Sequence, residues 1–139
     1  MPTLSSSFRP APRRPAVLLV DDDPAVTALV SRWLCGHRHA QVHIAHDGPT
    51  AIQIVATQSV DAVFSDVELL EENGVDLIRV LQLVAPALPL CLMSAKMSRS
   101  RALGAHCVRV DGFLTKPLTA ASIVDRLDMM LQAPSFGAR

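Results

Sequence analysis

The sequence predicts a doubly wound α/β domain, in which helices cover both faces of a five-stranded parallel sheet. Two observations support this fold class. Short apolar runs alternate with segments whose apolar residues recur at helical spacing, and the alternation repeats five times. The short runs are apolar almost throughout, which is typical of strands buried on both faces. Strand–helix alternation of this kind builds a parallel sheet with right-handed crossovers.

The first half of the domain is expected to contain two strands and two helices. Pro24 fits the first turn of a helix, with Asp22 or Asp23 as its N-cap, and Gly36 is expected to end that helix. Asp47-Gly48-Pro49 turns the chain into a second, shorter helix. The two strands are expected at residues 16–20 and 41–45.

The second half continues the same pattern. A third strand, residues 62–65, ends at Asp66, and a loop should separate it from a helix marked by apolar residues from Val75 to Val84. Thr119 is placed to cap the last helix. The remaining elements are a strand at 88–93, a polar helix at 97–107 and a short strand at 112–115.

Length and composition exclude several classes of protein. The 139 residues suffice for one domain, and a hydrophobic content of 50% supports a substantial core. Basic and acidic residues number 13 each, so nucleic-acid binding through bulk positive charge is not expected. The sequence contains no membrane-length apolar run and no apolar stretch typical of a secretory signal. We therefore expect a cytoplasmic protein with a domain at 16–132 and flexible tails at 1–15 and 133–139.

Cysteine and histidine do not predict a metal site. The three cysteines are widely spaced and include no Cys-x-x-Cys pair, so they are expected to be reduced packing residues. Four histidines crowd one short window, but their spacing places them on no common face, and solvated side chains are expected. The histidines are His37, His39, His43 and His46.

Polar residues instead gather at the carboxyl ends of the predicted strands, where ligands bind in open α/β sheets. Asp21 and Asp22 follow the first strand, Asp66 the third, Ser94 the fourth and Lys116, one of two lysines, the fifth. Converging carboxylates repel each other unless a cation joins them, and their hard oxygens suit Mg²⁺.

These groups together could carry out phosphoryl transfer. Asp66, beside Mg²⁺ and a lysine, would be an ionised nucleophile that can accept a phosphoryl group. The reaction requires in-line positioning and neutralisation of the phosphoryl oxygens, which Mg²⁺, Lys116 and the Ser94 hydroxyl could each provide.

At these residues the sequence resembles the receiver domain of two-component response regulators, over roughly residues 16–132. Each matching motif is weak alone, but the combination is specific. The spacing between Ser94 and Lys116 also agrees with the family. The matching stretches are Val17–Pro24, Asp66 followed eight residues later by Gly74, Leu92–Ala95, and Phe113–Pro117.

The resemblance implies the flavodoxin-like strand order 2-1-3-4-5 and a role for each site residue. Asp66 would be phosphorylated, while Asp21, Asp22, Asp66 and the Glu68 backbone carbonyl would hold Mg²⁺. Ser94 and Phe113 would be the switch residues, and Lys116, before a cis peptide bond to Pro117, would contact the phosphate.

The resemblance also implies a signalling protein that catalyses only its own phosphorylation and dephosphorylation. A histidine kinase or phosphotransfer protein would be the donor. The output would be protein–protein contact through the face of the fourth helix, fifth strand and fifth helix, where Arg99, Arg101 and Arg109 could meet an acidic partner or a second copy. A monomer or a weak phosphorylation-dependent dimer is expected. Only residues 132–139 follow the domain, too few for a DNA-binding unit, so the chain is a stand-alone receiver or part of a longer protein.

The chain departs from the family pattern at a few positions. Leu70 stands where a proline is frequent, which leaves the following loop less stiff, and Phe113 replaces a frequent tyrosine and lacks its hydroxyl. Glu68 and Lys96 lie two residues after Asp66 and Ser94. We hypothesise that their side chains pair across the site and tune the lifetime of the acyl phosphate; otherwise they are exposed charges of little effect.

Two other functions remain open. A phosphatase of the haloacid dehalogenase type would use Asp21 as nucleophile, but that family needs a further acidic pair beyond the lysine, and Asp125 and Asp128 lie within a helical pattern. A receiver-like docking module that is never phosphorylated is disfavoured because all the site residues are present.

Overall fold

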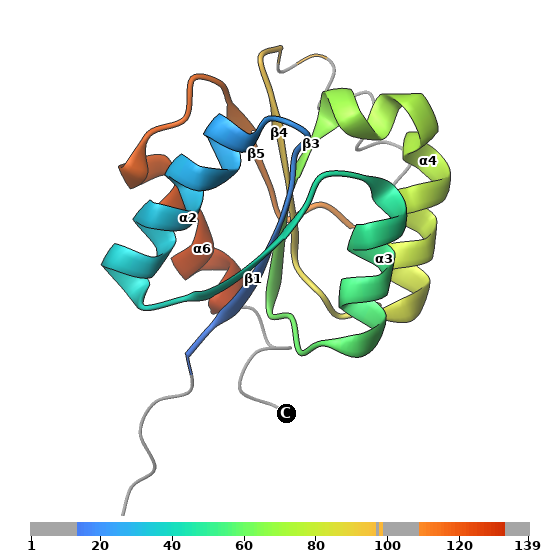
Figure 1. The fold of residues 1–139 in the computed structure, drawn as a ribbon, viewed down its shortest axis with the longest axis horizontal. Helices are drawn as coiled ribbons and strands as arrows, with labels where there is room; N and C mark the ends of the chain where they lie inside the picture. The colour runs from blue at the N-terminus through green and yellow to red at the C-terminus, as the bar shows by residue number, and fades with distance from the viewer. Residues whose placement is uncertain (1–13, 97, 99–108, 133–139) are drawn as a thin grey trace, which may run out of the picture.

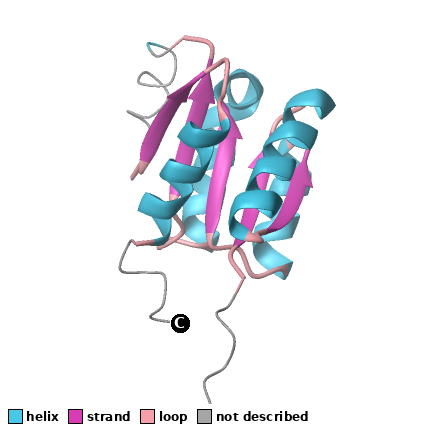
Figure 2. Cartoon of the chain, turned by 90° about the vertical axis from the view of Figure 1, so that its left-hand side faces the viewer, coloured by secondary structure: helices cyan, strands magenta, loops and turns pink. Residues whose placement is uncertain are grey.

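The computed structural model of the chain describes residues 14–96, 98 and 109–132. Within them, five parallel strands form one sheet in the order β2-β1-β3-β4-β5, which confirms the predicted fold and strand order. Figure 2 shows the strands running in one direction. The strands are β1 (Ala16–Val20), β2 (Gln41–Ala45), β3 (Ala62–Asp66), β4 (Leu90–Ser94) and β5 (Gly112–Thr115).

Helices cover both faces of the sheet (Figure 1). On one face α2 (Pro24–Arg38) packs beside α6 (Ala120–Leu131), and on the other α3 (Gly48–Thr57) packs beside α4 (Val67–Val84). β1, β3 and β4 are buried along their whole length because they lie in the middle of the sheet. None of the helices in the described parts of the chain is long and apolar enough to cross a lipid bilayer.

Alternate residues of each strand supply the two cores. Leu18 on β1 points to the core beneath α3 and α4, whereas its neighbour Leu19 points to the core beneath α2 and α6. Ile78 closes the first core and Leu127 the second, and both are fully buried. Since burying each such side chain contributes roughly 1.5–3 kcal/mol, the two cores hold the strand ends in fixed relative positions.

The end of α2 differs from the prediction. The helix passes through Gly36 and ends at His39, which has a left-handed φ of 52°. The N–H groups of His39 and Ala40 bond to the carbonyls of Cys35 and Leu34 and so satisfy the last turn. A Cβ at Gly36 would meet nothing within 4 Å, so no close approach ends the helix there.

The start of α4 also differs, and this matters for the site. The loop expected after Asp66 is helical: α4 begins at Val67 with Asp66 as its N-cap. Residue 70 is the fourth residue of this helix, and its backbone N–H is the one that can donate to the carbonyl of the N-cap. A proline there would have no N–H, whereas Leu70 has one, so the helix can begin directly after Asp66. The fourth strand is Leu90–Ser94, one to two residues later than predicted. The helix expected at 97–107 and the tail beyond residue 132 lie outside the described residues, as does most of the N-terminal tail.

Candidate functional site

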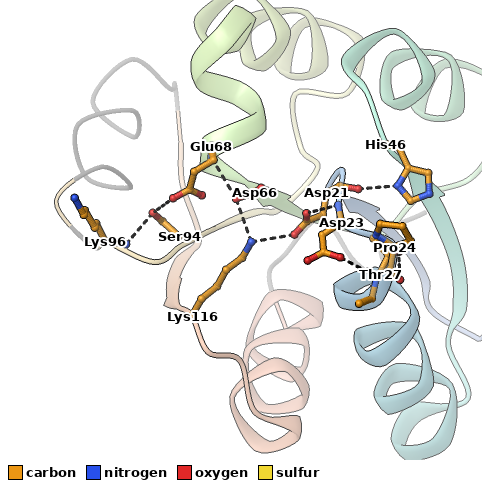
Figure 3. A network of polar contacts seen from close by, with 11 residues as sticks. Asp21, Asp23, Pro24, Thr27, His46, Asp66, Glu68, Ser94, Lys96 and Lys116 are labelled. Carbon is orange, nitrogen blue, oxygen red and sulfur yellow. Dashed lines mark hydrogen bonds and ion pairs between the residues drawn. The ribbon is translucent and has the colours of Figure 1, made fainter.

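The structure brings the predicted strand-end residues together at one edge of the sheet (Figure 3). The Lys116 Nζ atom, just beyond β5, lies 3.1 Å from Asp21 Oδ2 and 3.3 Å from Asp66 Oδ1. Both carboxylates are almost completely buried, with residue exposures of 1% for Asp21 and 3% for Asp66. Burial opposes the charge of Lys116, but its bonds to these carboxylates outweigh burial and raise its pKa.

Three carboxylates at this edge could share a metal ion. Carboxylate oxygens of Asp21, Asp22 and Asp66 all lie within 4.8 Å of one another. Across the described residues, no other group of three or more His, Cys, Asp and Glu side chains has this arrangement, and the histidine window forms none there. Asp22 is exposed, so the cluster opens to solvent. Hard, anionic oxygens at this separation fit Mg²⁺.

The neighbours of the acidic turn fix its geometry. The Asp23 N–H donates to Asp21 Oδ1 at 3.0 Å, and the Asp23 carboxylate caps α2 by accepting the N–H of Ala25 at 2.9 Å. The His46 ring, from the end of β2, bonds through Nδ1 to the Asp21 carbonyl at 2.8 Å. This contact could not be predicted from the sequence, since the role of His46 depends on β2 lying beside β1.

Glu68 lies in the first turn of α4, and its side chain points back into the site. Its Oε1 atom accepts the Ser94 hydroxyl at 3.0 Å, and its N–H donates to Asp66 Oδ1 at 3.3 Å. Burial, a side-chain hydrogen bond with Glu68 and the charge of Asp21 raise the pKa of Asp66 to about 7, although Lys116 opposes this. The same bond with Asp66 lowers the pKa of Glu68 to about 2. Between these two pKa values the metal-free pair of carboxyl groups therefore retains one proton.

The other predicted switch and lifetime residues lie around this centre. The Lys96 N–H donates to Ser94 Oγ at 3.0 Å, while its side chain extends away from Glu68 in Figure 3. Phe113 is partly buried and packs against the core beneath α3 and α4. The Lys116–Pro117 peptide bond is cis, as expected.

The basic segment expected to meet a partner is only partly described. The Arg109 guanidinium binds Asp111 at 3.2 Å and the Ala87 carbonyl at 3.0 Å, which anchors it within the domain. Arg99 and Arg101 lie outside the described residues.

An apolar groove adjoins the site between α2 and the loop after β5. It has a volume of about 270 Å³ and is lined mainly by apolar side chains. Lys116 lines the groove and also reaches the carboxylates, so the groove adjoins the acidic site. Helical spacing alone cannot show this groove, because half of its wall comes from a segment distant in sequence. The lining residues are Val26, Leu29, Val30, Trp33, Lys116, Pro117 and Leu118.

Comparisons with known sequences agree with this geometry. The model of the response regulator receiver domain family matches residues 17–128. Transcriptional regulatory protein GlrR of Escherichia coli K12 is 32% identical over 125 residues, which cover 88% of this chain and 28% of that protein. Response regulator MprA of Mycobacterium ulcerans is 29% identical over 84% of this chain and 50% of its own length. The chain thus spans about a quarter to a half of the curated relatives it matches.

Solved structures share the fold at lower sequence identity. The signal receiver domain of an HD domain-containing protein from Pseudomonas fluorescens superposes with a TM-score of 0.77 at 23% identity, covering 90% of this chain and 92% of the other. A Burkholderia pseudomallei response regulator, solved with a phosphorylated aspartic acid and a calcium ion, gives a TM-score of 0.70 at 21% identity, covering 81% and 66%. The fold, the strand-end residues and the family match over residues 17–128 agree, and the chain belongs to the response regulator receiver domain family.

Proposed function

We propose that this chain is the phospho-acceptor switch of a two-component pathway and that Asp66 accepts the phosphoryl group. One observation carries the proposal: the Asp66 carboxylate lies at the centre of the site, 3.3 Å from Lys116 Nζ and beside Glu68, which holds the Ser94 hydroxyl. Membership of the receiver family supports it and favours it over the phosphatase alternative with Asp21 as nucleophile. In this proposal the chain catalyses only its own phosphorylation and dephosphorylation.

The chemistry follows from the groups around Asp66. An Asp66 oxygen attacks the phosphorus of a phosphohistidine whose other ring nitrogen is protonated. The new O–P bond forms as the P–N bond breaks, and the histidine leaves as a neutral imidazole that keeps this proton. The Lys116 ammonium neutralises negative charge on the phosphoryl oxygens. The Ser94 hydroxyl, buried at the end of β4, is the neutral donor that can contact a phosphoryl oxygen.

Asp21, Asp22 and Asp66 would hold Mg²⁺, together with the Glu68 backbone carbonyl. When bound, the cation supplies charge neutralisation for the transferred group. The donor set supports this assignment, since its three carboxylates lie close together and open to solvent. The Burkholderia response regulator was solved with both a phosphorylated aspartic acid and a calcium ion, which is compatible with a divalent cation in this proposal.

A histidine kinase or phosphotransfer protein would supply the phosphoryl group. The apolar groove offers such a donor a docking surface near Asp66, because Lys116 lines the groove and also contacts Asp66. An apolar helix face on the donor would fill the groove and hold the phosphohistidine near the acceptor. The output would be contact with another protein through the face that contains β5 and α6, without direct binding of nucleic acid.

Labelling with acetyl phosphate and Mg²⁺ tests the proposal. Intact mass should rise by one phosphoryl group, peptide mapping should place the label on Asp66, and Asp66→Asn should abolish it. Label retained on Asp21 in the Asp66→Asn variant would favour the phosphatase mechanism instead. The lifetime hypothesis is tested on the same material, because a Glu68→Ala, Lys96→Ala double variant with an unchanged dephosphorylation rate would contradict it.

A further inference from the structure

The Ser94 hydroxyl already donates its proton in the unphosphorylated protein. Its Oγ atom donates to Glu68 Oε1 at 3.0 Å and accepts the Lys96 N–H at 3.0 Å (Figure 3). The Ser94 side chain is buried, with an exposure of 0%, so water cannot replace a lost partner at low cost. The switch hydroxyl is therefore held by a carboxylate and a backbone amide.

The residue that holds Ser94 also contacts the acceptor. The Glu68 N–H donates to Asp66 Oδ1 at 3.3 Å while its Oε1 accepts the Ser94 hydroxyl, so one residue contacts both the phosphorylation site and the switch hydroxyl. A phosphoryl group on Asp66 that accepts a hydrogen bond from Ser94 needs the same hydroxyl proton that Glu68 now accepts. Glu68 consequently makes, within the resting protein, the contact that the phosphoryl group would make after transfer.

A hydroxyl has a single proton to donate, so the two acceptors cannot both receive it. We propose that Glu68 is an internal competitor of the phosphoryl group: it holds the Ser94 hydroxyl until phosphorylation of Asp66 displaces it. This inference rests on the proposed function of Asp66. Glu68 thereby keeps the switch in its resting state and sets how strongly the phosphoryl group must bind Ser94 to change it.

The local backbone explains how residue 68 reaches this position. Because α4 begins at Val67, Glu68 falls in the first turn, with its N–H bonded to the Asp66 carboxylate. A glutamate at a helix start is also favoured by the helix dipole, whatever Ser94 does. Competition therefore needs a test that depends on Ser94 as well as on Glu68.

The test is a double-mutant cycle that measures the affinity for beryllium fluoride, a stable mimic of the phosphoryl group, at saturating Mg²⁺ by ¹⁹F NMR. Glu68→Ala should raise the affinity about tenfold when Ser94 is present, since both the competing bond and the repulsion are lost. In a Ser94→Ala background it should raise the affinity only about threefold, because repulsion alone is relieved. Asp125→Asn on the exposed side of α6 removes one charge elsewhere and is the matched control.

The outcomes separate this inference from the proposed function. Equal fold-changes in the two backgrounds would show that Glu68 acts through charge alone, and a loss of affinity with Ser94 present would show that it prepares the site; either overturns the inference. Wild-type protein that binds no beryllium fluoride would overturn the proposed function and the inference together. Thermal unfolding of all five proteins, the control included, checks that each variant is folded.

Discussion

The Lys116 ammonium lies 3.1 Å from the Asp21 carboxylate, although the two residues are 95 positions apart. Asp21 follows β1 and Lys116 follows β5, and two strands of the sheet separate β1 from β5. The lysine therefore spans the site and also contacts Asp66 at 3.3 Å. Without it, two buried carboxylates would face each other with no cation between them in the metal-free protein.

Replacing Lys116 by Met should slow phosphorylation of Asp66 by acetyl phosphate at least about tenfold, because a preorganised positive charge on the transferred group is lost. The rate is measured by intact mass at saturating Mg²⁺. Arg79→Met, on an exposed position of α4, removes a charge away from the site and should leave the rate unchanged. Equal rates for wild type and Lys116→Met would contradict the role given to the lysine.

The arrangement of the site could be predicted because it depends on strand ends. The residues after each apolar run are fixed by the sheet, and Asp21, Asp66, Ser94 and Lys116 meet where the prediction placed them. The direction of the Glu68 side chain could not be predicted, since it follows from α4 beginning directly at Val67. Sequence periodicity marks helices by their apolar positions and does not show where a polar first turn begins.

The partial exposure of Trp33 is a second feature that the sequence does not predict. Its helical spacing with Val30 and Leu34 predicts a residue that faces the core, and it does pack against the core beneath α2 and α6. It is only partly buried, however, and it lines the groove beside Lys116. Whether an apolar residue at the border of a helix face is covered depends on segments that pack there from elsewhere in the chain.

Metal-free protein should lose stability as the pH rises from about 4.5 to about 7. Over this range an unfolded chain has released the protons of Asp66 and Glu68, whose ordinary pKa values are 3.8 and 4.5, whereas the folded pair retains one. The folded state then binds more protons, so its free energy of unfolding falls with pH. Asp66→Asn should flatten this dependence and stabilise the metal-free protein at pH 7 by ~2 kcal/mol.

Urea unfolding at several pH values, in the presence of a chelator, measures this effect. Asp125→Asn is the control and should retain the wild-type pH dependence. Saturating Mg²⁺ should remove the dependence in wild type, since a bound cation favours the ionised carboxylates. A stability of wild type that rises between pH 5 and 7 without metal would contradict the shared proton.

Substitution of Asp22 should weaken metal binding with little effect on the stability of the fold. It is exposed, unlike Asp21 and Asp66, so Asp22→Ala should change the free energy of unfolding by less than about 0.5 kcal/mol without metal. The same variant should weaken Mg²⁺ binding about tenfold or more, because one of three anionic ligands is lost. Calorimetric titration of Mg²⁺ measures the affinity, and unchanged binding would exclude Asp22 from the ligand set.

The groove beside Lys116 predicts a difference between protein and small-molecule phosphodonors. Leu29 lines the groove and is 44% exposed, so Leu29→Glu should leave the fold intact while placing a charge where an apolar donor helix would pack. Transfer from a phosphorylated histidine protein should slow about tenfold, since a buried unpaired charge opposes docking. Labelling by acetyl phosphate, which needs no docking surface, should be unaffected.

Leu83→Glu, at an 80% exposed position of α4 outside the groove, is the matched control and should change neither rate. Equal slowing with both donors would show that Leu29 acts on the site itself, and no slowing with either would exclude the groove as the donor surface.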